Sequence, residues 1–450
     1  MPATQPLRIF FSVGEPSGDL HAANLIRELR SRCGSFEAVG YGGPNMAEAG
    51  CRLHADLTAL AVMWLARVFA NLKTFWGLLE RADAYFAAER PDAVVLIDYP
   101  GFNWWIARRA KARGIPVFYF SPPQLWAWGA WRIKKMRAFV DHVLCCLPFE
   151  EAWFRERGCR ATFVGHPFFD EVRRREFDAT FVAAHRARGG PLVTILPGSR
   201  TQEVLLNLKM FLKSAARVRE AVPGVRFAVA AFKESQAQMA RQQVAEAGFA
   251  PRWTPDAPAT APTVVEVFTG KTPELMHLAD CCMACSGSVS LELLYHTKPT
   301  VILYQISRFG YNVQKFFRKV KYITLVNLLS TGELYAADLS LYDPRQPDAE
   351  KVLFPEYLTC EDRTVQIARH VIEWLEQPAR RESIVKSLAR LKEQVAHDGA
   401  SRRAAEYIVH VLRPEVPAPH HDFSQQAGEK VIPRVHGGGK GPGTFFSRRA

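Results

Sequence analysis

Short apolar runs alternate with amphipathic stretches along most of the 450-residue chain. The runs are rich in β-branched and aromatic residues and are apolar at consecutive positions, a pattern typical of parallel strands buried on both faces. We predict strands at Leu7–Val13, Ala93–Ile97, Val117–Phe120, His142–Cys146, Leu192–Leu196, Arg226–Ala230, Cys281–Cys285 and Thr300–Tyr304. Helical patterns lie between them, so the fold class is predicted to be α/β with parallel sheets.

The predicted strands fall into two groups, separated by the charged stretch 170–188. We therefore predict two doubly wound, Rossmann-like domains with a cleft between them. The polar, Pro- and Asp-containing stretch 333–354 is predicted to be a surface insertion. Residues 415–450 contain few large aliphatic residues and are predicted to form a disordered tail.

The segment 57–79 is apolar at helical spacing and carries only two charges, Arg67 and Lys73. One interpretation is a helix packed into the core; the other is an interfacial helix whose tryptophans enter a lipid leaflet. In the second interpretation the membrane-facing residues are Trp64, Leu65, Val68, Phe69, Leu72, Phe75 and Trp76. The stretch 307–325 interleaves aromatic with basic residues and leaves the same choice open, between a solvated helix with one buried face and a membrane or polyanion contact.

Composition narrows the class of protein. With 48% hydrophobic and 23% charged residues the chain is not mainly disordered, collagen-like or coiled-coil. The net charge of +13 favours anionic partners, which are nucleic acid, nucleotide phosphates or an acidic lipid surface. No charged-then-apolar leader and no long uncharged apolar stretch is present, so we expect a protein that is neither secreted nor integral to a membrane.

The nine cysteines do not form a disulfide framework, because they are odd in number and most lie inside apolar runs. A reducing compartment is the simpler interpretation. Cys282 and Cys285 have the spacing of a zinc half-site, but no second pair accompanies them. We predict no metal site and no cofactor.

Two candidate sites follow strands of the first group. Leu7–Val13 runs into Gly14-Glu15-Pro16-Ser17-Gly18-Asp19, a small-residue turn at the sheet edge where doubly wound folds bind ligands. The turn is not G-x-G-x-x-G, so a dinucleotide site loses support, and its glycines could serve only the turn itself. Asp98 directly follows Ala93–Ile97, and partial desolvation there would raise its pKa toward that of a general base. The alternative for Asp98 is an N-cap of the next helix.

The second group carries two turns suited to phosphate. Pro197-Gly198-Ser199-Arg200 offers backbone N–H groups at a helix start together with one arginine. Ser286-Gly287-Ser288 opens a helix that carries Glu292 about one turn in. Two such turns suggest a diphosphate site, in which Glu292 either accepts from ribose hydroxyls or only interacts with its own helix dipole.

His166, in Gly165-His166-Pro167, is a candidate donor to a phosphate or sugar hydroxyl, or a structural cap of that turn. The chain shows neither a Ser–His–Asp order nor an H-E-x-x-H motif, so hydrolytic nucleophiles and zinc proteases have no support.

Taken together, these motifs resemble lipid-A-disaccharide synthase, a family of inverting glycosyltransferases of the GT-B type. The resemblance rests on the turns above and on Gly42-Gly43-Pro44-Asn45-Met46, Asp98 with Phe102-Asn103, Ser121-Pro122-Pro123-Gln124-Leu125-Trp126-Ala127-Trp128, Leu147-Pro148-Phe149-Glu150, Val164-Gly165-His166-Pro167, Leu291-Glu292 and Asn327. These motifs are in the family's order over roughly residues 8–360.

The resemblance implies transfer of diacylglucosamine from UDP-2,3-diacylglucosamine to 2,3-diacylglucosamine 1-phosphate, giving a β-1,6 disaccharide and UDP. It implies Asp98 as the base, and substrate contacts from Glu15, Ser17, Asn103, His166, Ser199, Arg200, Ser286, Gly287, Ser288, Glu292 and Asn327. A domain 1–172, completed by helices near 383–413, would face the acylated acceptor and the membrane, and a domain 173–381 would bind the UDP-sugar. We expect a cytoplasmic protein, peripherally attached to the inner membrane of a Gram-negative-type bacterium.

Departures from the family pattern concern the acyl-chain and acceptor side. Trp64 stands where the family has glycine, Ser121-Pro122-Pro123-Gln124 is one residue longer than the family motif, and Thr359 stands where the family has glutamine. A soluble UDP-sugar epimerase of GT-B type is the alternative enzyme. A nucleic-acid-binding protein is the non-enzymatic alternative, and no recognised nucleic-acid module supports it.

Overall fold

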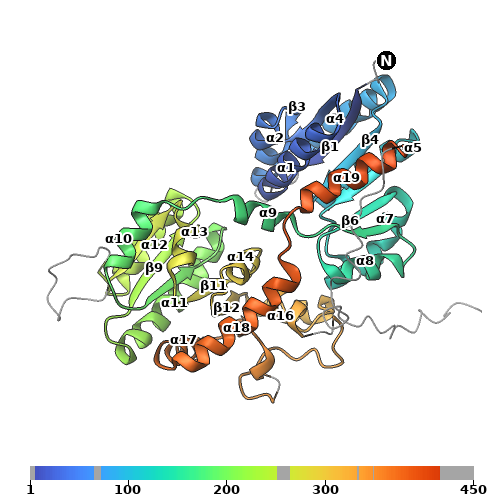
Figure 1. Ribbon diagram of the computed structural model, residues 1–450. Coiled ribbons are helices and arrows are strands. Elements are labelled where there is room, and N and C mark those ends of the chain that lie inside the picture. The colour runs from blue at the N-terminus through green and yellow to red at the C-terminus, as the bar shows by residue number, and fades with distance from the viewer. Residues whose placement is uncertain (1–5, 65–71, 251–263, 332–333, 348, 416–450) are drawn as a thin grey trace, which may run out of the picture.

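The computed structural model describes residues 6–64, 72–250, 264–331, 334–347 and 349–415. Two parallel β-sheets form two halves, each with helices packed against its sheet (Figure 1). The predicted α/β class with two doubly wound parallel sheets is therefore confirmed.

The first half contains a seven-stranded sheet in the order β3-β2-β1-β4-β5-β6-β7. Its strands are β1 Leu7–Val13, β2 Phe36–Gly42, β3 Arg52–Asp56, β4 Ala93–Ile97, β5 Val117–Phe120, β6 His142–Cys145 and β7 Ala161–Phe163. Its helices are α1 Pro16–Arg32, α2 Pro44–Glu48, α3 Leu57–Trp64, α4 Leu72–Glu89, α5 Pro100–Ala112, α6 Leu125–Trp128, the 3₁₀ turn η1 Ala130–Arg132, α7 Ile133–Phe139 and α8 Pro148–Arg155. Alternate residues of β1 enter two separate hydrophobic clusters, with Phe10 in one and Ile9 and Phe11 in the other. This explains why Ile9, Phe10 and Phe11 are apolar at successive positions.

The second half contains a six-stranded sheet in the order β10-β9-β8-β11-β12-β13. Its strands are β8 Leu192–Leu196, β9 Arg226–Ala231, β10 Val265–Thr269, β11 Cys281–Cys285, β12 Thr300–Gln305 and β13 Glu356–Thr359. Its helices are α10 Ala179–Ala187, α11 Thr201–Ala221, α12 Glu234–Glu246, α13 Thr272–Leu278, α14 Val289–Tyr295, α15 Arg308–Phe317, α16 Leu325–Ser330, the 3₁₀ turn η2 Ala349–Lys351, α17 Thr364–Glu376 and α18 Pro378–Val395. The three cysteines of β11 are buried, and burial raises the pKa of each of their thiols.

The chain passes between the halves twice, through α9 (Pro167–Arg174) and through the link between α18 and α19 (Ala400–Leu412). The Asp170 carboxylate joins the two crossings, because it accepts the backbone N–H groups of Gly399, Ala400 and Ser401 at 2.5, 3.1 and 2.9 Å. Helix α19 then packs along α1 of the first half (Figure 1). Helix α18 packs on α14 and α17 of the second half, so only the α19 part of the predicted region 383–413 joins the first half.

The apolar segment 57–79 forms α3 and the start of α4. Leu57 and Leu79 are buried, Phe75 is half-buried against the core, and the Trp76 side chain is 54% exposed. Core packing is therefore confirmed at the ends of this segment, and the interfacial interpretation, which the exposed Trp76 indole permits, stays a prediction. The side chains of Trp64 and Leu72 and all of Leu65, Val68 and Phe69 lie outside the described residues, as do residues 416–450.

The stretch 307–325 is a helix only as far as Phe317. Phe309 at its start is 79% exposed, whereas Lys321 and Tyr322 are buried at 8% and 5% exposure. The Lys321 ammonium lies 3.6 Å from the Asp338 carboxylate. The choice between a solvated helix and a membrane or polyanion contact therefore concerns α15 alone, because the second part of the stretch is buried against residues 334–342.

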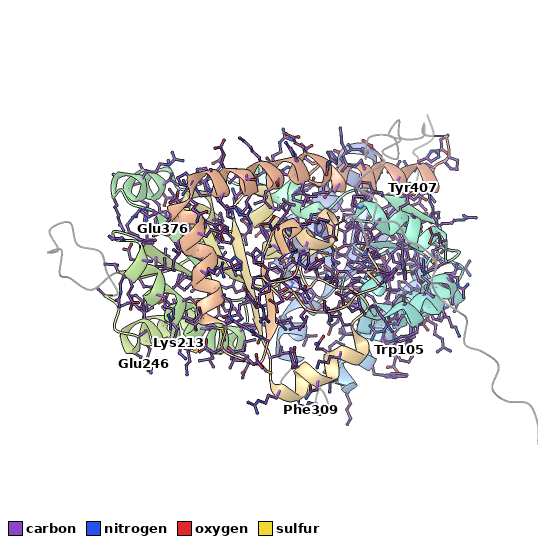
Figure 2. The ribbon with its side chains drawn as sticks, turned by 90° about the horizontal axis from the view of Figure 1, so that it is seen from below. Trp105, Lys213, Glu246, Phe309, Glu376 and Tyr407 are labelled. Atoms are coloured by element: carbon purple, nitrogen blue, oxygen red, sulfur yellow. The ribbon has the colours of Figure 1, made fainter. Side chains whose placement is uncertain are left out.

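Figure 2 turns the molecule by 90° and places Phe309 of α15 and Tyr407 of α19 on opposite edges. In the described part of the chain, no helix has both the length and the hydropathy that crossing a bilayer requires.

Candidate active site

Each sheet has one topological switch point, where successive connections turn to opposite sides. In the first sheet this point lies between β1 and β4, and in the second between β8 and β11. Ligands of open α/β sheets bind at the carboxyl ends of strands at such points. The turn 14–19 follows β1 and Asp98 follows β4, while the turn 197–200 follows β8 and the turn 286–288 follows β11. The structure thus places the turn 14–19 and Asp98 at the first switch point, and the turns 197–200 and 286–288 at the second.

The turn after β1 packs directly on the turn after β4. A Cβ on Gly18 would lie 3.1 Å from the Asp98 carboxylate oxygen Oδ2, and a Cβ on Gly14 would enter the ring of Tyr99. Asp98 and Tyr99 have φ values of +48° and +42°, which cost conformational energy in L-residues and are concentrated at functional sites. The glycines are needed here because the two turns approach each other closely, and a ligand at this turn stays a prediction.

The environment of Asp98 favours a basic carboxylate. The pKa of Asp98 is raised to about 7, chiefly by desolvation and also by the negative charge of Glu15, while the Ser121 hydroxyl, 3.4 Å from Oδ1, acts in the opposite direction. The backbone carbonyl of Asp98 accepts from the Tyr119 hydroxyl at 2.6 Å and from the Asn103 side-chain amide at 2.8 Å. The residue is therefore fixed at the sheet edge with a pKa suited to proton transfer near neutral pH.

The Asn103 side chain holds the turn after β4 in place through hydrogen bonds. It is fully buried, its amide nitrogen donates to the carbonyls of Ser12, Ile97 and Asp98, and its amide oxygen accepts from the Ser12 hydroxyl. Its polar atoms are thus engaged within the protein, and the structure shows a positioning role; direct substrate contact stays a prediction. Glu15 and Ser17, by contrast, are exposed on the turn beside Asp98.

Asp19 is a structural residue that the sequence analysis did not single out. Its buried carboxylate accepts the backbone N–H groups of Gly43, Asn45 and Met46 at 2.8, 2.9 and 3.2 Å, and the Asn45 side-chain amide at 2.8 Å. This acid therefore ties the turn after β1 to the loop after β2. The signal in the sequence was an acid at the end of one glycine-rich motif and a second glycine-rich motif 24 residues on.

The turn after β8 differs from the expectation of free backbone donors. The N–H groups of Ser199 and Arg200 both donate to Oε2 of Glu203, at 3.0 and 3.1 Å, and the Arg200 guanidinium lies 3.3 Å from Oε1. Gly198 permits this arrangement, with φ of +126° and no Cβ to meet Glu203 at 2.5 Å. The expected phosphate donors of this turn are thus corrected to donors that cap their own helix through Glu203. The Arg200 side chain is 69% exposed and remains accessible to an anion.

At the turn after β11, Gly287 and Ser288 are exposed and Ser286 is half-buried. Glu292 is 7% exposed, and its carboxylate accepts a hydrogen bond of 2.6 Å from the guanidinium of Arg175. Arg175 is the residue that follows α9. The pKa of Glu292 is raised to about 7, chiefly by desolvation. The positive charge of Arg175 acts to lower this pKa, and the negative charge of Glu171 acts to raise it. Glu292 thus connects the predicted nucleotide site to the crossing between the halves.

His166 and Asn327 have internal partners. Nδ1 of His166 accepts the backbone N–H of Phe168 at 3.3 Å, and burial lowers the pKa of His166 to about 3. This is the structural cap that was one alternative for the residue. Asn327 is fully buried, and its amide exchanges hydrogen bonds with the backbone of Phe354 and donates to the buried Glu356 carboxylate at 2.8 Å.

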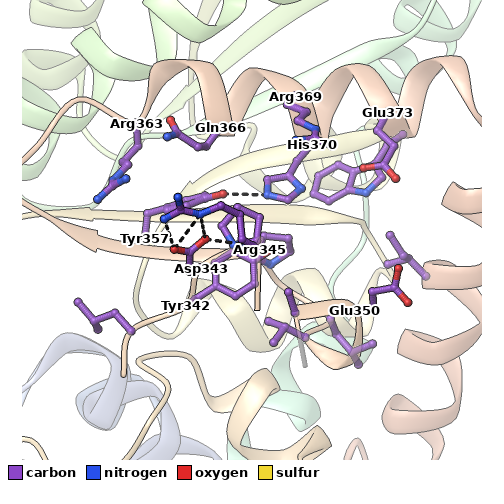
Figure 3. Close-up of a pocket in the computed structure, with 18 of the residues that line it drawn as sticks. Tyr342, Asp343, Arg345, Glu350, Tyr357, Arg363, Gln366, Arg369, His370 and Glu373 are labelled. Atoms are coloured by element: carbon purple, nitrogen blue, oxygen red, sulfur yellow. Dashed lines mark hydrogen bonds and ion pairs between the residues drawn. The ribbon is translucent and has the colours of Figure 1, made fainter. Parts of the chain in front are cut away.

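A cavity of about 790 Å³ lies away from both switch points, beside the edge strand β13 (Figure 3). Residues 341–345 and 349–353 form one wall and α17 the other, with the Tyr357 hydroxyl 2.9 Å from Nε2 of His370. The stretch 333–354 is thus not only a surface insertion, because part of it encloses this cavity. Among the described residues no group of His, Cys, Asp and Glu is arranged to hold a metal ion.

Comparison with known proteins decides the family. Residues 9–339 match the family model described as lipid-A-disaccharide synthetase. Curated lipid-A-disaccharide synthases of Syntrophus aciditrophicus and Myxococcus xanthus are 31% and 30% identical to the chain, over 90% and 91% of its length and 98% and 99% of theirs. The chain belongs to the lipid-A-disaccharide synthase family. It is a glycosyltransferase, as the motifs implied.

Solved structures similar to this synthase-family chain show the fold alone. They include a putative UDP-N-acetylglucosamine 2-epimerase from Listeria monocytogenes, with a TM-score of 0.59 and 10% identity over 92% of this chain and 98% of that one. The glycosyltransferase of kitacinnamycin has a TM-score of 0.51 and 17% identity, over 90% and 99%. The GT-B architecture is therefore shared by epimerases and transferases, and the family match at the sequence level does not favour the epimerase alternative.

Proposed function

We propose that the protein transfers diacylglucosamine from UDP-2,3-diacylglucosamine to 2,3-diacylglucosamine 1-phosphate, forming the β-1,6 disaccharide of lipid A and UDP. The observation that carries this proposal is the combination of the family match with a carboxylate of raised pKa at the first switch point. The first half, with α19, would hold the acceptor, and the second half the UDP-sugar.

Asp98 is proposed as the general base. The acceptor hydroxyl attacks the anomeric carbon from the face opposite UDP, its proton passes to the Asp98 carboxylate, and the bonding electrons of the sugar–phosphate bond leave with UDP. Base assistance of this kind contributes roughly 10²–10⁴ in rate. The pKa of about 7 leaves a large fraction of Asp98 ionised at neutral pH, as a base requires.

The exposed Arg200 guanidinium and the turn Ser286–Ser288 are proposed to stabilise the charge that develops on UDP. Ser199 and Glu292 would complete the donor site, with Glu292 accepting from the ribose. The exposed Glu15 and Ser17 would contact the acceptor. Asn103 and Asn327, whose side-chain amides have internal partners, and His166, whose Nδ1 accepts from Phe168, would act by holding the turns that carry these groups.

A membrane surface is the proposed location, on the cytoplasmic side, because donor and acceptor both carry two acyl chains. Trp76 at the start of α4 supports this, since its indole is exposed and has the Arg109 guanidinium 5.7 Å from the ring centroid. Replacing Trp76 with Glu is expected to reduce sedimentation with membranes; unchanged sedimentation and unchanged activity would favour a soluble enzyme.

The test is to incubate the purified protein with the diacylated UDP-glucosamine and the matching monosaccharide 1-phosphate and to identify the product by mass spectrometry. A disaccharide formed together with UDP supports the proposal. Conversion of the UDP-sugar alone to an epimer, with no disaccharide when the acceptor is added, would contradict it.

A further inference from the structure

The positive charge of the protein is concentrated in two segments of the sequence. Residues 101–140 and 306–331 together contain thirteen basic residues (Lys and Arg) and no acidic ones (Asp and Glu). The rest of the chain contains forty-five basic and forty-five acidic residues. The whole net charge of +13 therefore comes from these two segments. One belongs to the first half of the molecule and the other to the second.

The same two segments expose large aromatic side chains. Trp105 on α5, Trp131 in η1 and Phe309 at the start of α15 are 47%, 65% and 79% exposed. Cations lie among them: the Arg132 guanidinium is 5.0 Å from the Trp131 ring centroid, and the Lys315 ammonium is 4.9 Å from that of Tyr311. Aromatic side chains of this size, exposed among cations, are typical of membrane–water interfaces.

The two segments are far apart in the sequence but are in contact in the structure. The backbone N–H of Lys319 donates to the carbonyl of Ala127 at 3.3 Å, four residues before Trp131. Figure 2 shows Trp105 and Phe309 toward the same edge of the molecule, opposite Tyr407. Trp76 lies at the margin of this region, beside Arg109, where its indole N–H donates to Glu80.

We propose that the docking face, defined by Trp105, Trp131, Phe309 and the cations around them, binds a bilayer containing anionic lipids, with both halves of the protein in contact with it. The inference deepens the proposed function, because it extends the membrane contact from one helix of the first half to both halves. Exposed aromatic rings supply apolar contact at the headgroup level, and each cation near the surface adds attraction to anionic lipid.

A bilayer fits this face better than a nucleic acid. The cations of α5, of α15 and of the residues just after α15 include Arg108, Lys315 and Lys319, which are exposed and have no ion-pair partner among the described residues. A nucleic acid would satisfy these charges but gives no account of an isolated phenylalanine that is 79% exposed on one half and indoles on the other. Exposed rings on both halves together with cations match a surface that is both apolar and anionic.

The test measures binding of the full-length protein to vesicles by co-sedimentation, without any substrate. Vesicles of phosphatidylcholine alone are compared with three-to-one phosphatidylcholine and phosphatidylglycerol. The variants are Trp105→Glu for the first half, Phe309→Glu for the second, and the double variant Lys315→Glu with Lys319→Glu. Phe232→Glu is the matched control, because Phe232 is 63% exposed on the second half and lies outside both segments.

We expect wild type to bind the anionic vesicles more strongly, and each cation lost to weaken the partition coefficient about fivefold or more. Trp105→Glu and Phe309→Glu should each weaken it at least about fivefold, and Phe232→Glu less than twofold. The charge variant keeps the test decisive if an aromatic variant fails to fold.

Three results would overturn the proposal. Phe309→Glu binding like wild type would confine the contact to the first half. Equal binding to neutral and anionic vesicles would remove the role of charge. Tight binding to heparin with no binding to vesicles would assign the face to a polyanion. Failure of wild type to make the disaccharide from detergent-dispersed substrates would refute the proposed function and leave the vesicle result standing.

Discussion

Replacing Asp98 with Asn removes the ionisable group while keeping its size and most of its hydrogen bonds. The backbone contacts of the residue to Asn103 and Tyr119 do not involve the side chain and should persist. We expect the turnover number to fall roughly 10²–10⁴-fold, because the variant has no base to take the acceptor proton. UDP binding should persist, because Asp98 lies at the first switch point and the UDP turns at the second.

The same substitution should stabilise the fold. The pKa of Asp98 is about 7 in the folded protein against an ordinary value of 3.8, chiefly because of desolvation. Between these pH values the unfolded chain ionises while the folded protein keeps the proton, so the free energy of unfolding falls as pH rises through this window. The difference corresponds to up to about 4 kcal/mol above pH 7, and the neutral amide of the Asp98→Asn variant would carry no such penalty.

The assay combines three measurements: turnover against pH, UDP binding by calorimetry, and urea unfolding at pH 4 and pH 8. Wild-type turnover should rise with pH and level off above about 7, and the stability gain of Asp98→Asn should be larger at pH 8. Asp83→Asn is the matched control, because hydrogen bonding to Arg113 lowers the pKa of Asp83, so that its substitution should slightly destabilise the protein and leave turnover intact. Near-normal turnover in Asp98→Asn, or a loss of stability at pH 8, would refute the reasoning.

Three further predictions concern the turns around the site. Asp19→Asn should lower the free energy of unfolding by about 2–3 kcal/mol in urea titrations, because a buried carboxylate accepting four N–H bonds loses its charge and part of its hydrogen bonding; an unchanged midpoint would contradict its role as a tie. Gly198→Ala should weaken UDP binding in calorimetry by about tenfold, because its Cβ would collide with Glu203 at a φ of +126°; wild-type affinity would show that this turn does not shape the UDP site. Arg175→Met should raise the pKa of Glu292 above about 7, so that UDP binding weakens at pH 7 and recovers at higher pH, while Arg175→Lys retains most of it; pH-independent binding in both variants would contradict the coupling.

The strands that are buried on both faces could be predicted almost to the residue, as β1, β4, β5, β8 and β11 show. The missed strands β2, β3, β10 and β13 lack that signal, since β3, β10 and β13 are edge strands and carry polar residues. In β2 the sequence contains Gly40, which is present because a Cβ there would collide with the backbone of Phe11 in β1. Such a requirement arises only from the pairing of strands and cannot be recognised before the pairing is known.

Sequence motifs predicted where the candidate site lies, but not whether its backbone N–H groups are free to bind a ligand. The turn 197–200 has the residues of a phosphate-binding loop, yet a glutamate three residues further along the chain takes up its N–H groups. The pair of Arg175 and Glu292 joins residues 117 positions apart, and no local pattern predicts it. The burial of residues 321 and 322 could not be predicted either, because an alternation of basic and aromatic residues does not reveal that a later loop covers them.

The return of the last helix to α1 has a consequence for biosynthesis. The sheet of the first half is translated early, but the helix that covers one side of α1 is the last helix of the described residues to be translated. Until then a strip of α1 and the apolar residues beneath it stay open to water. A nascent chain stalled before Ala400 would therefore have an incomplete first half with exposed apolar surface, which makes it prone to aggregation. This is the stage of synthesis at which we expect a chaperone to be needed most.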